Sequence, residues 1–121
     1  MRTTLGGLLL ALAVAATAPA GDPAAGERVF SARCAFCHSA TAGRNGTGPS
    51  LFGVVGRKAG QAPDYRYSDA NRTADVTFDA ATLEKYLTSP RAVIPGTKKS
   101  FSGLKSAAQR DDVIAYLATL H

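Results

Sequence analysis

The chain has 121 residues and a formal net charge of +5, with 14 lysines and arginines against nine acidic residues. This length is enough for one small domain. The positive charge does not indicate a nucleic-acid-binding protein, because only 7% of the residues are aromatic and no recognised nucleic-acid-binding motif is present.

The first 20 residues have the pattern of a secretory signal peptide. Arg2 supplies a positive charge, residues 5–16 are apolar and uncharged, and Ala-Pro-Ala at 18–20 provides small residues before a cleavage site. The apolar stretch is too short to span a bilayer comfortably, although an uncleaved N-terminal anchor is an alternative. We therefore expect cleavage after Ala20, a mature periplasmic domain of residues 21–121, and no stable insertion in a membrane.

Capping residues and apolar spacing predict the helices. Asp22-Pro23 is an N-cap followed by proline at the first helical position, and this helix should run toward Cys34. A short helix is expected over 69–73, and another begins near Asp79 and ends before Pro90. A C-terminal helix follows Ser106, which forms a capping box with Gln109. Each of the last two helices has an apolar face. The helix that begins near Asp79 carries Leu83, Tyr86 and Leu87 on this face, and the C-terminal helix carries Val113, Tyr116, Leu117 and Leu120.

Loops rich in glycine and proline occupy residues 43–49, 53–63 and 90–103. No segment alternates as a strand would, so the sequence predicts an all-α domain. Loops of this length are uncommon in a compact domain unless they surround something.

Residues 34–38 read Cys-Ala-Phe-Cys-His and contain both cysteines of the chain. Two thiols at this spacing on a helical turn can each form a thioether to one vinyl group of a haem, and the adjacent histidine then faces the iron. A tetrahedral zinc site needs four ligands, and only His121 would remain as the fourth. A thioredoxin-like pair needs a βαβ context, and a disulfide would leave His38 unexplained. The motif therefore predicts one haem c, covalently bound through Cys34 and Cys37, with His38 on the iron.

The mature sequence resembles the class I cytochromes c of the long bacterial and mitochondrial type. Beyond the haem motif, the resemblance rests on Gly-Pro-Ser-Leu at 48–51, Gly-Arg-Lys-Ala-Gly at 56–60, Tyr-Ser-Asp-Ala-Asn at 67–71 and Ile-Pro-Gly-Thr-Lys at 94–98. It implies the small cytochrome c fold, in which the terminal helices cross and long loops wrap a covalent haem. Gly26, Phe30 and Tyr116 match the residues at that crossing.

Further haem contacts are implied by the same resemblance. Pro49 would accept a hydrogen bond from the ring nitrogen of His38 that does not bind iron. Arg57 and Tyr67 match positions that satisfy a haem propionate. Asn71 and Tyr86 match the polar groups around a buried water.

The chain departs from the family at the second axial ligand. In the family, the loop that supplies the second axial ligand, here called the far loop, normally ends Pro-Gly-Thr-Lys-Met. In this chain residues 95–99 read Pro-Gly-Thr-Lys-Lys, and the single methionine is Met1. We therefore expect no His/Met ligation and place Lys99 on the iron. Lys98, or water or a vacant site, are the alternatives. His121 is disfavoured, because the matching helix packs away from this loop.

A lysine ligand has energetic consequences. Presenting a neutral amine at pH 7 costs roughly 4 to 5 kcal/mol, since a free lysine has a pKa of about 10.4. Burial beside the haem lowers this cost, because desolvation disfavours the ammonium form. Replacing a soft thioether by a hard amine should favour ferric iron and lower the reduction potential.

These features predict a monomeric, periplasmic single-electron carrier that is not an enzyme. No acid lies between Arg28 and Pro63 or between Lys85 and Arg110, and these basic stretches contain the haem motif and the far loop. Such a surface favours acidic docking faces, as on a quinol-oxidising complex, a terminal oxidase or a photosynthetic centre. The alternative is a haem protein whose labile or open sixth site binds small ligands or shows peroxidase-like activity. A substitution introduced at position 99 of an ordinary family member would give the same sequence.

Overall fold

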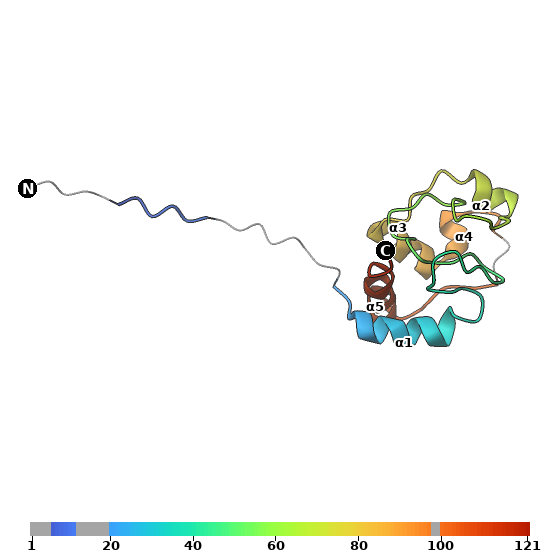
Figure 1. Cartoon of the computed structure of the whole chain (residues 1–121), viewed down its shortest axis with the longest axis horizontal. Coiled ribbons are helices and arrows are strands. Elements are labelled where there is room, and N and C mark those ends of the chain that lie inside the picture. Colours follow the sequence, from blue (N-terminus) through green and yellow to red (C-terminus); the bar gives the residue numbers. More distant parts are fainter. Residues whose placement is uncertain (1–5, 12–19, 98–99) are drawn as a thin grey trace, which may run out of the picture.

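The computed structural model describes residues 6–11, 20–97 and 100–121 (Figure 1). Within these residues the chain forms five helices: α1 (Pro23–Arg33), α2 (Asp69–Thr73), α3 (Ala80–Thr88), α4 (Pro90–Val93) and α5 (Ala107–Leu117). The β-type pairing in the described part is a single antiparallel bridge between Lys58 and Thr77. The predicted all-α class is confirmed.

Side-chain caps fix where the helices begin. The Asp22 carboxylate accepts a hydrogen bond from the Ala24 amide at 3.0 Å and starts α1, whose first residue is proline. Asp79 accepts from the Thr82 amide at 2.7 Å and starts α3. Ser106 accepts from the Gln109 amide at 3.2 Å and starts α5. These helix starts were therefore predictable from local sequence, because a capping side chain satisfies an otherwise unpaired amide of the first turn.

The prediction that residues 90–103 form a loop throughout is wrong, because Pro90–Val93 form the short helix α4. Proline ends the preceding helix, but its fixed φ also suits the first position of a new one. Ser89 lies between the two helices in an extended conformation, with φ −156° and ψ 102°. The Ile94 amide then donates to the Pro90 carbonyl at 2.9 Å and closes the new turn.

The terminal helices α1 and α5 cross at one end of the domain (Figure 1). A Cβ atom on Gly26 would overlap the Asp112 carbonyl and lie 2.8 Å from the Tyr116 Cβ, so the absence of a side chain permits the close approach. The rings of Phe30 and Tyr116 meet edge to face beside it, with centroids 5.5 Å apart. The crossing expected from these three residues is confirmed.

The hydrophobic core surrounds α5, which packs against both α1 and α3. Leu104 and Val113 have the largest fully buried side chains. The Leu104 amide donates to the Leu87 carbonyl at 2.7 Å, which fastens the segment before α5 onto the end of α3. The buried members of the core are Phe30, Val54, Leu83, Leu87, Leu104, Val113, Ile114 and Leu117.

No helix in the described parts of the chain has the length and apolar character needed to cross a membrane.

Candidate haem-binding site

The three haem-motif side chains come from one tight turn at the end of α1. The Cys34 amide still donates to the Phe30 carbonyl, at 2.8 Å, and the amides of Cys37 and His38 both donate to the Cys34 carbonyl, at 3.1 and 3.0 Å. This turn brings both cysteines and the histidine to the same part of the surface, where all three are partly buried. Since α1 is held by α5, the crossing of the terminal helices also positions the motif.

Both motif cysteines are free thiols. Burial raises the pKa of the Cys34 thiol, and the positive charge of Arg33 acts in the opposite direction. Two reduced sulfurs on one turn are the donor set that two thioether bonds require.

The ring of His38 is oriented by the chain that follows the motif. Its Nδ1 lies 2.7 Å from the Pro49 carbonyl oxygen. A carbonyl can only accept, so Nδ1 carries the proton and Nε2 keeps the lone pair that a metal needs. A Cβ on Gly48 would lie 2.6 Å from Nδ1, which explains the glycine at that position. The expected contact between His38 and Pro49 is therefore present.

Arg57 fastens the loop that carries Pro49. Its guanidinium donates to the carbonyls of Phe52 and Ser50, at 3.0 and 3.3 Å. The structure thus places Arg57 against the backbone of the loop that carries Pro49, here called the proximal loop. The contact of Arg57 with a haem propionate stays a prediction.

Tyr67 approaches the loop that begins near residue 53. Its hydroxyl oxygen accepts from the Ala62 amide at 2.9 Å, so its own proton can be donated to a further acceptor. The rings of Tyr65 and Tyr67 pack edge to face at 4.8 Å. A propionate oxygen would suit this donor, and that role also stays a prediction.

Asn71 and Tyr86 lie on different helices. Asn71 is buried in α2, and its side-chain oxygen accepts from the Ser68 hydroxyl at 3.1 Å. Tyr86 lies on α3 against Phe78, with ring centroids 5.1 Å apart, and burial raises the pKa of its phenol to about 12. Their expected place around a common buried water is a prediction.

Thr97 is a polar residue of the far loop for which sequence reasoning proposed no role. It is 4% exposed, and its hydroxyl has no hydrogen-bond partner among the described residues. A buried hydroxyl without a partner is costly, so this one fits an acceptor that the described residues do not supply. A haem propionate is such an acceptor. The available signal was the hydroxyl residue in the Pro-Gly-Thr segment of the loop motif.

The predicted ligand Lys99 and its alternative Lys98 lie outside the described residues. The chain is anchored on both sides of them. Ile94 is 2% exposed and its carbonyl accepts from the Thr97 amide at 3.2 Å, while Phe101 packs against the hydrophobic core.

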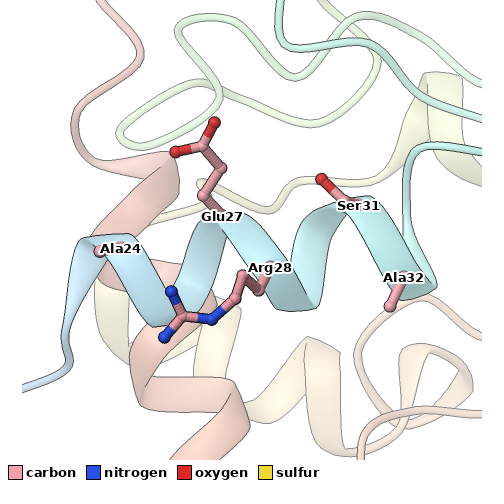
Figure 2. Close-up of a pocket in the computed structure, with 5 residues that line it drawn as sticks. All are labelled: Ala24, Glu27, Arg28, Ser31 and Ala32. Carbon is pink, nitrogen blue, oxygen red and sulfur yellow. The ribbon is translucent and has the colours of Figure 1, made fainter.

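A shallow hollow of about 540 Å³ lies elsewhere, on the surface of α1 (Figure 2). None of the haem-motif residues contributes to it, so it is not the candidate site. The residues that line it are Ala24, Glu27, Arg28, Ser31 and Ala32.

Comparisons with known proteins agree with this geometry. The sequence model of the cytochrome c family matches residues 23–121. Cytochrome c2 of Rhodoblastus acidophilus is 52% identical over 100 residues, which cover 82% of this chain and 92% of that protein. Cytochrome c2 of Rhodomicrobium vannielii is 52% identical over 103 residues, covering 84% and 82%. The solved structure of cytochrome cH from Methylobacterium extorquens has a TM-score of 0.76 and 47% identity, and covers 82% of this chain and 99% of that one.

The chain belongs to the cytochrome c family. Family members bind a covalent haem c, and Cys34 and Cys37 occupy the attachment motif. The protein is accordingly an electron carrier with a c-type haem and is not an enzyme.

Proposed function

We propose that this protein is a periplasmic single-electron carrier of lowered reduction potential, with His38 and Lys99 on the haem iron. The observation that supports His38 as one ligand is the hydrogen bond from its Nδ1 to the Pro49 carbonyl, because a neutral ring that donates from Nδ1 has its lone pair on Nε2. The bound haem supplies the one-electron redox couple.

Lys99 is supported as the second ligand by its position. The far loop matches its family pattern without a gap from Ile94 to Lys98, and Lys99 stands where the methionine is expected. Thr97 is buried and Phe101 packs on the core, so Lys99 stands in the sequence two residues from an anchored residue on each side. An amine at that position favours the ferric state, which lowers the potential.

An electron paramagnetic resonance spectrum of the ferric holoprotein at neutral pH tests the ligation. We expect a low-spin signal in the parent, a high-spin signal in Lys99→Ala, and an unchanged low-spin signal in the matched control Lys98→Ala. A change in Lys98→Ala alone would assign the ligand to Lys98. A high-spin parent that binds cyanide rapidly would mean an open sixth site and favour the ligand-binding alternative.

The reduction potential provides a second test. Lys99→Met should restore His/Met ligation and raise the potential, because a soft thioether stabilises ferrous iron better than an amine does. An unchanged potential and an unchanged spectrum would remove Lys99 from the iron.

The periplasmic location rests on residues 1–20. Leu8, Leu9 and Leu10 are 89%, 97% and 77% exposed, so these three leucines contribute nothing to the core of the domain. We expect the mature protein to begin at Gly21, which intact-mass measurement of the periplasmic fraction would reveal. An unprocessed protein in the membrane fraction would instead indicate an N-terminal anchor.

The partners are expected to present acidic faces. Arg28, Arg33, Lys58 and Lys105 are all exposed. Oxidation of the ferrous protein by anionic ferricyanide should slow as salt is added, whereas oxidation by cationic tris(phenanthroline)cobalt(III) should accelerate. The same salt dependence for both oxidants would contradict electrostatic steering by this surface.

A further inference from the structure

One peptide group in the loop after the haem motif is held at both of its ends. The carbonyl of the peptide between Pro49 and Ser50 accepts from His38 Nδ1 at 2.7 Å. The N–H of the same peptide donates to the side-chain oxygen of Asn45 at 2.9 Å. Asn45 is therefore joined to the ring of His38 through a single peptide group.

The other end of the Asn45 amide reaches a second loop. Its Nδ2 donates to the Pro63 carbonyl at 3.0 Å. The planar amide of Asn45 thus links the loop that carries Pro49 to the segment at residue 63. The bond to Pro63 fixes the direction in which the Asn45 amide oxygen points. The amide oxygen is aimed at the Ser50 amide because its nitrogen is occupied by Pro63.

The linked peptide is shielded from water. Gly48, Pro49 and Ser50 are all buried, Ser50 with 5% exposure. Consecutive hydrogen bonds polarise one another, and this effect is stronger in a site from which water is excluded, because solvent no longer screens the charges. Changes at Asn45 should therefore be transmitted to His38 through this peptide.

We infer that Asn45 is a positioning residue that tunes the electron donation of His38 to iron through the Pro49–Ser50 peptide. When the Ser50 N–H donates to Asn45, electron density on the Pro49 carbonyl rises and that oxygen becomes a stronger acceptor for His38 Nδ1–H. A more strongly polarised Nδ1–H makes the imidazole a better donor at Nε2, which stabilises ferric iron. This inference rests on the proposed ligation by His38.

A purely mechanical role for Asn45 predicts something different. If the side chain only holds two loops together, every substitution that breaks the contact with Pro63 lowers the stability of the protein. The reduction potential then does not depend on the acceptor strength of the residue at position 45. If Asn45 instead acts through the peptide, the reduction potential depends on how strongly the side chain at position 45 accepts a hydrogen bond from the Ser50 N–H. A stronger acceptor lowers the potential and a weaker one raises it. Alanine removes that acceptor, whereas aspartate strengthens it and replaces the donor to Pro63 with a second acceptor oxygen.

The test is the reduction potential of the holoprotein with Asn45→Ala and Asn45→Asp. Asn45→Ala should raise the potential, so that the ratio of oxidised to reduced protein falls about two- to fivefold at a fixed solution potential. Asn45→Asp should shift the ratio in the opposite direction. Thr47→Asp is the matched control, because it adds the same charge at an exposed position of the same loop. An unchanged potential in Asn45→Ala, or equal shifts in the two aspartate variants, would overturn the inference.

A measurement on the parent protein covers the case in which a variant does not fold. Nuclear magnetic resonance of the reduced holoprotein should show a Ser50 amide proton that exchanges with solvent at least tenfold more slowly than that of exposed Thr47. Exchange as fast as at Thr47 would overturn the inference, because the Ser50–Asn45 hydrogen bond would then be open.

Failure of the inference can be told apart from failure of the proposed function. If His38 does not bind iron, its ring protons lack the large haem ring-current shift in the parent protein, whatever residue occupies position 45. If that shift is present and Asn45→Ala leaves the potential unchanged, ligation by His38 stands and only the tuning by Asn45 is wrong.

Discussion

Tyr86 is the ionisable side chain whose burial has the clearest consequence. Burial raises the pKa of its phenol to about 12, from an ordinary value near 10. The unfolded chain therefore loses this proton at lower pH than the folded protein does. The stability that depends on the neutral phenol is complete below about pH 10 and is lost as the pH rises from about 10 toward 12.

This behaviour predicts an alkaline loss of stability that Tyr86→Phe lacks. Between pH 9 and pH 11, the free energy of unfolding of the parent should fall by on the order of 1 kcal/mol more than that of the variant. Guanidinium unfolding followed by circular dichroism at the two pH values measures the difference. Equal losses in the two proteins would show that Tyr86 ionises as readily in the folded state as in the unfolded chain.

At the scale of secondary-structure elements, the crossing of α1 and α5 depends on one glycine. In Gly26→Ala the new methyl group would overlap the backbone of Asp112, and the two helices would have to separate. We expect the free energy of unfolding to fall by about 2 to 4 kcal/mol.

Guanidinium unfolding of Gly26→Ala and of a control on the same helix checks this expectation. Ser31→Ala is suitable, because Ser31 is exposed on α1 and its replacement should change stability by less than about 0.5 kcal/mol. Similar stabilities for Gly26→Ala and Ser31→Ala would mean that the helices can separate at no cost.

An ion pair joins α3 to α5 and to the segment between them. Arg110 Nε donates to Glu84 Oε1 at 2.7 Å, and the same guanidinium donates to the carbonyls of Leu104 and Lys105 at 2.7 and 3.2 Å. The Arg110 side chain is only 13% exposed, and Glu84 Oε2 is buried without a hydrogen-bond partner among the described residues. Glu84 therefore depends on Arg110 for the compensation of its charge.

Removing one partner of this pair should cost more than removing both. Arg110→Met leaves a partly buried carboxylate unpaired and should lower the free energy of unfolding by about 2 kcal/mol or more, whereas Glu84→Met combined with Arg110→Met should recover part of that loss. Arg72→Met is the control, because it breaks the exposed pair with Asp69 and should cost less than about 1 kcal/mol. Additive losses in the double variant would contradict a coupled pair.

At the scale of the whole molecule, the covalent haem completes a small domain whose loops are long. Cys34→Ala should leave one thioether and lower the yield of mature protein, and Cys34→Ala combined with Cys37→Ala should leave no haem attached after denaturation in acidified acetone. Mass spectrometry of the extracted polypeptide measures the attachment. Haem retained on the double variant would contradict attachment through these two cysteines.

Most helix starts and the haem motif were predictable because they depend on residues close together in the chain. Asp22, Asp79 and Ser106 cap amides two or three residues away, and the motif cysteines share one turn. The helix α4 was missed because Pro90 satisfies both the end of one helix and the start of the next. Local sequence does not choose between these two roles.

By itself, the sequence determined the haem-attachment motif, the helical class and the lack of a methionine at position 99, since each follows from residue identity and short-range spacing. Only the tertiary structure decided that Arg57 donates to loop carbonyls, that Asn45 reaches both Ser50 and Pro63, and that the buried Thr97 hydroxyl has no hydrogen-bond partner among the described residues. These facts depend on the direction of side chains toward segments brought together by folding. Sequence spacing carries no information about that direction, because it is set by packing.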